Sequence, residues 1–508
     1  MSAVSQRAAA LQRLTQEPLD VLVIGGGIVG SGIARDAAMR GLKVGLVEQH
    51  DFAFGTSSRS SRLLHGGLRY LAQGRVGLVH EASVEKKVIH QIAPHLADPL
   101  PFVFPTYRGN PHWVLWQLKI GVKVYDLLCG GRNLGQSTWL NKNETLQQVP
   151  ALLAVNLNGA VRYYDGLTND ARLTLDTLRS AARSSACLVN YCRFKDATRS
   201  EVWDCAIEDR LTGTELRVRA RTLVNATGPW ADGLPHSRVK LRGTKGVHLV
   251  VDRSRVPVPD TVVMTEGKRI LFAIPWGERT ILGTTDTDFT GALDKVTADQ
   301  EDIRYILRVT NQFFPKANLV DGDVISAWAG VRPLIANANG KPSDISRSHD
   351  IRNPEPGWWD VAGGKLTTYR LMAEQTLDRI VREQGFQSGP CRTATEPLLP
   401  AAETAGLSGI LPPEFNRQFV EHACLREWAV HLDDVMVRRT SWHYYFKDAL
   451  VRAEHVADWM AELLGWSVPT RNEELQRYRE LTRFGAAPAP VTPANPHQAR
   501  ELSPALVK

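Results

Sequence analysis

The chain has 508 residues, 43% of them hydrophobic and 23% charged, so it is long enough for two or three domains around a deep binding cleft. Its formal net charge of +7 and isoelectric point near 9.1 suit anionic substrates or an anionic membrane surface, but no run of lysine and arginine supports nucleic-acid binding. Six cysteines are scattered without metal-ligand spacing, so we predict neither a metal site nor a disulfide framework, and a reducing compartment is favoured.

The first 18 residues contain Arg7 and Arg13 but not the apolar core of a secretory signal. We therefore expect residues 1–18 to be a flexible lead-in. No apolar run in the chain has the length that a bilayer-spanning helix needs.

A glycine turn between a strand and a helix begins the predicted cofactor site. An apolar run leads into Gly25, Gly27 and Gly30, whose G-x-G-x-x-G spacing brings the backbone close to a pyrophosphate. Residues 28–40 have helical periodicity, and a second apolar run ends at Glu48, where an acid would bind a ribose hydroxyl and disfavour a 2′-phosphate. This order of elements predicts a dinucleotide-binding βαβ unit.

A hydroxyl-rich segment follows this unit. Thr56, Ser57 and Ser58 can hydrogen-bond phosphate or ribose, and Gly66 and Gly67 would let the backbone lie flat against a planar ring. An ordinary serine/threonine turn that caps the next helix is the structural alternative.

Residues 111–133 form an apolar segment that we interpret as an amphipathic helix. Trp113 and Trp116 lie about one turn apart, and Lys119 and Lys123 are similarly spaced. Such aromatic and basic side chains favour contact with a membrane surface, whereas a core helix whose lysines reach solvent is the alternative.

Strand-like segments dominate the middle of the chain. Alternating runs at 187–209 and 215–224 end in a turn at 225–228 that returns the chain to the cofactor. The runs between 241 and 286 predict a mixed sheet for a substrate domain. Arg332 stands between a glycine and a proline at the end of a strand, a position that suits anion binding.

A second strand, glycine turn and helix begin at Asp360. Gly363 and Gly364 form the turn, and helical periodicity continues to about Glu383, so the helix start is expected to direct N–H groups at the cofactor. Beyond Pro397 the sequence changes to helical patterns, at 415–431, 433–440 and 446–464.

Seven motifs in this order resemble the FAD-dependent glycerol-3-phosphate dehydrogenase family: Gly25 to Gly30, Thr56 to Ser58, His65 to Tyr70, Asn225 to Trp230, Gly283 to Asp286, Gly330 to Pro333, and Gly363 to Arg370. The resemblance covers about residues 20–370, with a weaker match at 432–440. Between 400 and 432 the chain lacks the longer helical insert typical of the family, which leaves its domain contacts and oligomer geometry open.

The resemblance implies FAD as the cofactor. The implied cofactor contacts are Gly25, Gly27, Gly30, Glu48, Thr56, Ser57, Ser58, His65, Gly66, Gly67, Ala226, Thr227, Gly228, Gly364, Lys365, Leu366 and Thr367. In the family the last of these turns contacts the pyrimidine edge of the flavin, where a positive helix dipole stabilises the reduced anionic ring.

Oxidation of a secondary alcohol by a flavin needs a hydride acceptor, a base for the hydroxyl proton, and charge to hold an anionic substrate. The resemblance implies hydride transfer from C2 of sn-glycerol 3-phosphate, giving dihydroxyacetone phosphate. His248 is the first choice for the base and His65 the second. Arginines would bind the phosphate in pairs of hydrogen bonds, and Lys365 would help to polarise the C2 oxygen. The implied substrate contacts are Arg69, Tyr70, Thr285, Arg332, Arg347 and Lys365, with Arg332 and Lys365 also counted as catalytic.

The predicted fold class is α/β with α+β character: a Rossmann-like FAD-binding domain of the two-dinucleotide-binding type, a mixed-sheet substrate domain and a C-terminal helical domain. After the lead-in, the predicted segments are FAD-binding parts at 19–100, 161–240 and 346–390, a substrate- or membrane-facing insertion at 101–160, the substrate domain at 241–345, the helical domain at 391–485 and a disordered tail at 486–508.

The implied partners are sn-glycerol 3-phosphate, a quinone as electron acceptor and a membrane surface, with no nucleic acid, and the sequence is compatible with a homodimer. We expect a cytoplasmic protein attached peripherally to the inner membrane. Two alternatives stay open: an oxidase that passes electrons to dioxygen and releases peroxide, and a flavin-binding module without turnover. An amino acid or another polyol phosphate would share the cofactor half, and only the arginines favour a phosphate.

Overall fold

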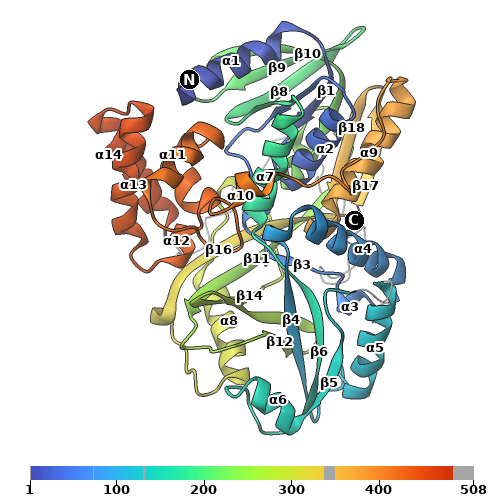
Figure 1. Cartoon of the computed structure of the whole chain (residues 1–508), viewed down its shortest axis with the longest axis vertical. Coiled ribbons are helices and arrows are strands. Elements are labelled where there is room, and N and C mark those ends of the chain that lie inside the picture. The colour runs from blue at the N-terminus through green and yellow to red at the C-terminus, as the bar shows by residue number, and fades with distance from the viewer. Residues whose placement is uncertain (1, 72–73, 130–132, 337–348, 484–508) are drawn as a thin grey trace, which may run out of the picture.

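The computed structural model describes residues 2–71, 74–129, 133–336 and 349–483. Within these residues two β-sheets lie one above the other in Figure 1, with C-terminal helices beside their junction. The upper sheet consists of β1 (Leu19–Ile24), β2 (Val44–Val47), β7 (Cys187–Val189), β8 (Cys192–Arg199), β9 (Trp203–Asp209), β10 (Glu215–Asn225), β17 (His349–Glu355) and β18 (Trp358–Gly363).

The centre of the upper sheet is parallel. Its order is β17-β18-β10-β1-β2-β7, and the β8–β9 hairpin pairs with β10. One face is covered by three helices, α2 (Ile28–Met39), α7 (Asp170–Arg183) and α9 (Tyr369–Gln384). Helix α2 packs tightly on the first glycine turn, because a Cβ atom at Gly30 would lie 1.9 Å from the carbonyl oxygen of Gly25.

The other face of the upper sheet is covered in part by a helix at the N-terminus, so the expectation of a flexible lead-in at residues 1–18 is wrong. Helix α1 (Ala3–Gln16) buries Leu14 completely against the sheet. Arg7 forms an ion pair of 2.7 Å with Asp209, and the thiol of Cys187 lies 3.2 Å from the carbonyl oxygen of Ala10. The helix is stable because it docks, not because its own sequence is strongly amphipathic.

The lower sheet consists of β3 (Leu63–Leu64), β4 (Asp98–Tyr107), β5 (Thr138–Asn141), β6 (Leu157–Leu167), β11 (Leu241–Asp252), β12 (Thr261–Glu266), β13 (Arg269–Trp276), β14 (Arg279–Gly283), β15 (Thr287–Asp288) and β16 (Val324–Ile335). Its order is β15-β11-β14-β13-β12-β4-β6-β3, with β16 paired to β11 and β5 to β6. Helix α8 (Gln300–Phe313) covers one face. Further helices lie between residues 68 and 148 of the chain: α3 (Leu68–Leu71), α4 (Val76–Ile92), α5 (Leu115–Leu128) and α6 (Lys142–Gln148).

The pairing of β4 changes the predicted domain boundaries. Strand β4 lies between β12 and β6, so the region 101–160 is part of the substrate sheet and not an insertion beside it. Strand β6 extends to Leu167, and the short β3 pairs with it, so residues 63–64 and 161–167 also belong to this sheet. The error arose because strand pairing between distant segments is not visible in local periodicity.

Helix α5 has an exposed face that includes Trp116 as predicted, but Trp113 is not part of it. Trp113 precedes the helix and is buried, with its indole N–H donating to the carbonyl oxygen of Gly267 at 3.0 Å. Trp116 is 61% exposed, and three further apolar side chains are exposed nearby in the chain: Ile120, Leu127 and, on β5, Trp139. Lys119 lies over the Trp139 ring at 5.2 Å, which joins α5 to β5 in one surface. Among the described residues, no helix combines the length and apolar character needed to cross a bilayer.

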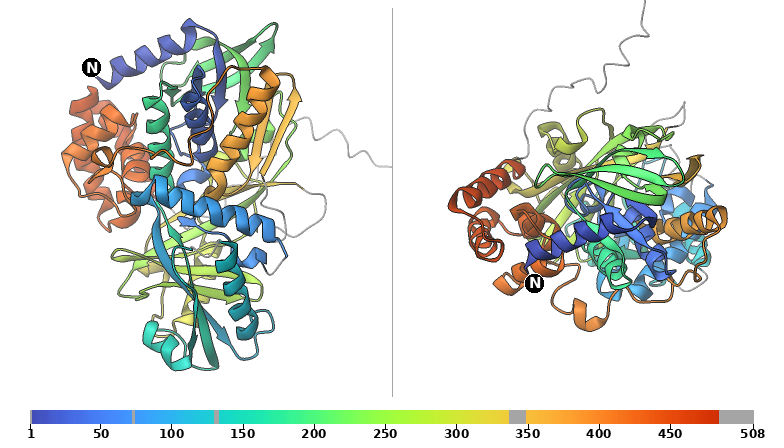
Figure 2. Two further views of the ribbon diagram at one scale, coloured as in Figure 1. Left: turned by 45° about the vertical axis from the view of Figure 1, so that its right-hand side comes forward. Right: turned by 90° about the horizontal axis from the view of Figure 1, so that it is seen from above.

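The C-terminal part is helical and lies beside both sheets (Figure 2). It contains α10 (Ala401–Thr404), α11 (Arg417–Arg426), a π-helical segment at Asp434–Arg439, α12 (Trp442–Tyr445), α13 (Ala449–Leu464) and α14 (Val468–Leu481). Helices α11, α13 and α14 share a core of their own. The predicted tail at 486–508 lies outside the described residues.

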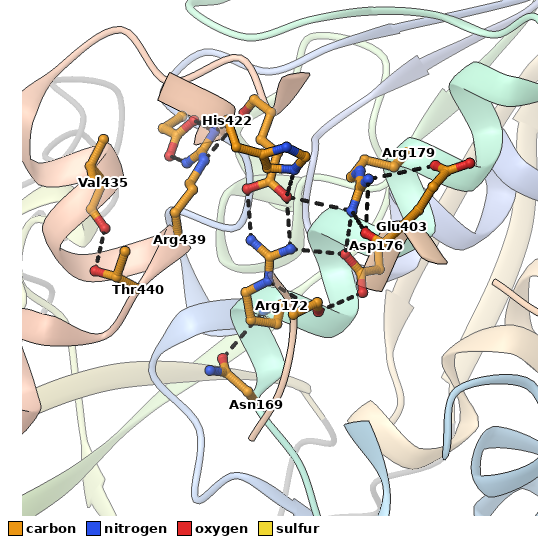
Figure 3. Close-up of polar contacts among 12 residues, drawn as sticks. Asn169, Arg172, Asp176, Arg179, Glu403, His422, Val435, Arg439 and Thr440 are labelled. Carbon is orange, nitrogen blue, oxygen red and sulfur yellow. Dashed lines mark hydrogen bonds and ion pairs between the residues drawn. The ribbon is translucent and has the colours of Figure 1, made fainter. Parts of the chain in front are cut away.

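Buried ion pairs join this helical part to the upper sheet. Arg172 of α7 donates to both carboxylate oxygens of Glu427 at 2.7 Å, and Figure 3 shows Arg172 and Arg179 directed toward the C-terminal side chains. Burial alone would raise the pKa of Glu427, but Arg172 and His422 hold it well below its usual range. In a second cluster, Arg438 and Arg439 both pair with Asp51, which follows β2.

Candidate active site

A cavity of about 510 Å³ lies between the two sheets. The carboxyl ends of the parallel strands β1, β2, β10 and β18 form its upper wall, and residues of β11 and β16 form its lower wall. The carboxyl edge of a parallel sheet is the usual place for a nucleotide ligand, and the volume is in the range of roughly 300–1,000 Å³ typical of small-molecule sites.

At the ends of β1 and β2, the cavity wall contains a carboxylate and the start of helix α2. Glu48 lies on the wall, where its oxygens accept hydrogen bonds from the backbone N–H groups of Gly26 at 2.7 Å and His50 at 2.8 Å. Burial raises the pKa of Glu48. Ser57 Oγ accepts from the N–H of Ile28 at 2.9 Å, so the hydroxyl loop is fixed against the start of α2.

Two further glycine-containing turns, at Gly228 and at Gly363–Gly364, continue the wall and fit a large planar ligand. Gly228 and Gly364 have left-handed φ angles of 58° and 81°, which side chains rarely adopt. A Cβ atom at Gly228 would meet no atom within 4 Å, so the space beside this turn is open to a ligand. After β18 the chain forms a single 3₁₀ turn at Leu366–Thr368 before α9 begins, so the helix does not start at the glycines as predicted.

A facing pair of glycines in the lower wall leaves room for two arginine residues. The partners His248 and Trp328, Gly246 and Gly330, and Thr244 and Arg332 lie opposite one another on β11 and β16, and they therefore point to the same face. The Arg332 guanidinium folds back over Gly246, where a Cβ atom would lie 2.4 Å from Nη2. Loop residue Arg59 covers Gly330 in the same way, at 2.8 Å.

His248 lies two residues from Gly246, beside this glycine pair. It is 1% exposed, its ring stacks on Trp328 at 5.3 Å between centroids, and its Nε2 is 2.8 Å from the Ser61 hydroxyl. Its Nδ1 is buried and has no hydrogen-bond partner among the described residues. Burial, together with the charges of Arg332 and Arg62, lowers the pKa of His248 well below its usual value, so the imidazole is neutral and can accept a proton.

Arg332 lies two residues from Gly330, on the other side of the glycine pair. Three consecutive residues of the chain hold it in place. Its guanidinium donates to the Thr284 hydroxyl at 2.9 Å, to the Thr285 carbonyl at 3.2 Å and to Asp286 at 3.2 Å. The side chain is 19% exposed and lines the cavity. A partly exposed guanidinium in a fixed orientation is suited to a phosphate.

Lys365 and His65 also line the cavity. The Lys365 ammonium lies 4.1 Å from the centroid of the Tyr70 ring and 3.4 Å from the carbonyl oxygen of Gly66. The backbone of His65 exchanges hydrogen bonds with the Thr367 hydroxyl at 3.0 and 3.2 Å, which ties the Gly66 turn to the turn after β18.

Several predicted contacts are placed differently. Tyr70 is buried behind Lys365 and is not on the cavity wall, and the Thr285 hydroxyl is used between strands, where it accepts from Val247 N–H at 3.0 Å. We therefore correct both to supporting positions. Ser58, Gly30, Gly66 and Gly67 likewise lie behind the wall. The side chain of Arg69 and the whole of Arg347 lie outside the described parts of the chain.

Sequence reasoning missed four residues around the proposed base and the glycine pair: Gly246, Ser61, Arg62 and Trp328. The hydroxyl-rich loop was predicted to bind phosphate or ribose, and Ser61 was not among its predicted contacts. The spacing of Gly246 and Gly330 two residues from a histidine and an arginine would have been the available signal, but it needs the register of β11 on β16.

The fold and this site define an FAD-dependent oxidoreductase: residues 20–377 match the family described as FAD dependent oxidoreductase, and residues 411–471 match the C-terminal domain of alpha-glycerophosphate oxidase. The chain is 40% identical over 405 residues to the aerobic glycerol-3-phosphate dehydrogenase of Bacillus subtilis, covering 77% of this chain and 73% of that protein. It therefore belongs to the FAD-dependent glycerol-3-phosphate dehydrogenase family, as the motifs predicted. A Staphylococcus aureus enzyme of the same name is 38% identical over 396 residues, 75% of this chain and 71% of its own length.

Solved structures agree with the fold. The glycerol-3-phosphate dehydrogenase from Bacillus halodurans, complexed with FAD, superposes with a TM-score of 0.75 at 29% identity, covering 94% of this chain and 97% of that chain. The L-alpha-glycerophosphate oxidase from Mycoplasma pneumoniae shares the fold, with a TM-score of 0.60 at 18% identity over 76% of this chain and all (100%) of that one. The predicted fold class and FAD cofactor are confirmed.

Proposed function

We propose that this chain oxidises sn-glycerol 3-phosphate to dihydroxyacetone phosphate. The observation that carries the proposal is the placement of a buried neutral histidine and a fixed arginine on the same face of β11 and β16, on either side of the Gly246–Gly330 pair. The Arg332 guanidinium lies over Gly246, and Gly246 is two residues from His248, or roughly 6.6 Å along a strand. A three-carbon phosphate can therefore direct its C2 hydroxyl toward the histidine and its phosphate toward the guanidinium.

The residues divide the reaction between them. Arg332 binds the phosphate. Lys365, on the side of the cavity where the cofactor would lie, polarises the C2 oxygen. His248 takes the hydroxyl proton through Nε2, because this nitrogen lies beside the wall residue Ser61, and Ser61 holds it until substrate arrives. Glu48 and the residues around Ser57 would hold the ribose and pyrophosphate of FAD, which would supply the acceptor for the hydride of C2.

A quinone in a membrane is the electron acceptor that we propose, with the protein attached peripherally to the membrane surface. Support comes from the exposed face of α5 and β5, which places Trp116, Ile120, Leu127 and Trp139 beside Lys119. Aromatic and aliphatic side chains flanked by lysine suit an interface with anionic lipid. Assembly as a homodimer rests on the family resemblance alone.

Anaerobic mixing of the FAD-loaded protein with sn-glycerol 3-phosphate tests the proposal. We expect the flavin absorbance to bleach, and His248→Asn to slow the bleaching by about 100-fold or more, the usual contribution of a general base. A wild-type protein that keeps its flavin oxidised would contradict the proposed substrate. An unchanged rate in His248→Asn would move the role of base to His65. Reoxidation by a quinone analogue, but slowly by dioxygen, would favour the dehydrogenase over the oxidase.

A further inference from the structure

Arg62 is a buried cation beside the proposed base that the mechanism above does not use. It is 2% exposed, and its backbone has a left-handed φ of 58°, which is unfavourable for a residue with a side chain. Its Nη2 donates to the Ser441 hydroxyl at 3.1 Å, whereas Nε and Nη1 have no hydrogen-bond partner among the described residues. No ion pair joins it to a carboxylate in that part of the chain.

Aromatic rings surround the Arg62 guanidinium instead of acids. Its central carbon lies 4.4 Å from the Trp276 ring centroid, 5.2 Å from that of Trp328 and 5.9 Å from that of Tyr444. Cation–π contacts of this kind offset only part of the desolvation of a buried charge. Because an apolar side chain of similar length would fill the same space without that cost, packing alone does not account for an arginine.

The Trp328 ring links Arg62 to His248. The same indole stacks on the imidazole with 19° between the planes, and its N–H donates to the carbonyl oxygen of Ser60 at 3.1 Å. Ser61, the next residue, touches Nε2 of His248. Three consecutive residues therefore contact the base or the ring on which it stacks.

We propose that Arg62 is a positioning residue of the reaction, which fixes the His248 imidazole through the shared Trp328 ring and keeps a positive charge beside it. This inference rests on the proposed role of His248 as the base. The C-terminal helical part takes part in the same arrangement, because it supplies Ser441 and Tyr444 to the surroundings of Arg62.

The charges around His248 determine the direction of the effect. Arg332 faces it from β16 with Asp286 as partner, and Arg62 faces it from the loop, with Asp170 as the acid that acts on Arg62. Burial raises the pKa of the nearby Tyr444 phenol, which therefore stays neutral, and Ser61 carries no charge. Removal of the Arg62 charge leaves Arg332 as the cation beside the imidazole, so protonation of His248 becomes easier and its pKa rises.

The test compares the pH dependence of anaerobic flavin bleaching by sn-glycerol 3-phosphate in four variants and the wild type. Arg62→Met and Arg62→Gln remove the charge, and Arg62→Lys retains it. Arg452→Met is the matched control, because Arg452 lies 3.9 Å from the Phe446 ring centroid in the C-terminal helices, away from the cavity. We expect the acid limb of the rate profile to move up by about one pH unit in the two neutral variants, and to stay in place in Arg62→Lys and Arg452→Met.

Thermal unfolding gives a second readout. We expect Arg62→Met to melt no lower than the wild type, because replacement of a desolvated charge by an apolar side chain is often neutral or stabilising. An acid limb that stays in place in both neutral variants, or that moves equally in Arg62→Lys, would overturn the inference about Arg62 while the wild-type bleaching still supports the proposed function. A wild type that does not bleach would instead overturn the proposed function itself.

Discussion

Arg332 is oriented by neighbours that leave part of its guanidinium facing the cavity. Thr284, the Thr285 carbonyl and Asp286 hold it from one side. A binding group fixed in advance loses little conformational freedom when the ligand arrives, so it contributes more of its interaction energy to affinity.

Replacement of Arg332 by alanine is therefore expected to reduce kcat/KM for sn-glycerol 3-phosphate by about 100-fold, corresponding to about 3 kcal/mol of lost charge-assisted hydrogen bonding. Most of the loss should be in KM, because the phosphate is distant from the reacting carbon. Arg255→Ala is the control, since Arg255 forms an exposed ion pair of 3.1 Å with Asp323 in the same domain. Steady-state kinetics with a quinone analogue measure both variants, and an unchanged KM in Arg332→Ala would refute the phosphate role.

The sequence indicated His248, Arg332, Lys365 and the turns at Gly25, Gly228 and Gly364, all of which lie on the cavity wall. It did not separate wall residues from those behind the wall, because a motif does not show which way a side chain faces: Tyr70 packs against Lys365, and the Thr285 hydroxyl is used between strands. Arg62 escaped attention because its neighbours come from segments more than 200 residues away, which only the tertiary fold brings together.

At the scale of elements, the glycine turn at Gly25 and the period of α2 were readable because both follow from local sequence. Helix α1 was not readable in this way. Its sequence buries only Leu14, and its stability comes from contacts with β7 and with Asp209, which lie far along the chain.

Leu14→Ala is expected to lower the free energy of unfolding by about 3 kcal/mol, because Leu14 is fully buried between α1 and the upper sheet. Val4→Ala on the same helix should have little effect, since Val4 is 67% exposed. Denaturant unfolding monitored by circular dichroism compares the two. Equal stability of both variants would mean that α1 does not dock on the sheet in solution.

The exposed face of α5 and β5 leads to a separate prediction. Trp116→Ser combined with Trp139→Ser should abolish cosedimentation with anionic liposomes and leave flavin bleaching by substrate in solution unchanged, because the two side chains are 61% and 58% exposed and do not line the cavity. The control replaces Leu450 and Val451, an exposed apolar pair on α13, by serine. Retained liposome binding in the tryptophan variant would assign membrane contact to another surface.

At the scale of the whole molecule, buried ion pairs connect the C-terminal helices to the upper sheet. Glu427 is fully buried against Arg172, and its pKa is held low in the folded state. In the unfolded chain the carboxyl returns to its ordinary value of 4.5. The ionised pair thus stabilises the fold above about pH 4.5, and this contribution is lost as the pH falls below that value.

Glu427→Gln is expected to destabilise the protein by about 3 kcal/mol at pH 7, because it leaves Arg172 buried with only Asp176 as an acidic partner. Its melting temperature should also depend less on pH between 5 and 3 than that of the wild type. Glu462→Gln serves as control, since its ion pair with Arg417 is exposed on both sides. A variant whose pH dependence equals that of the wild type would show that the Arg172 pair is not responsible.

The interleaving of the two sheets has a consequence for synthesis of the protein. Strands β1 and β2 emerge from the ribosome early, but β10 needs the parallel partner β18, which ends at Gly363, after the whole lower sheet has been made. The turn at 363–367 is the last part of the cavity wall in the order of the sequence. The nascent chain therefore acquires its complete nucleotide-binding wall only after Thr367 has been translated, so that FAD capture is expected to follow rather than guide the assembly of the lower sheet.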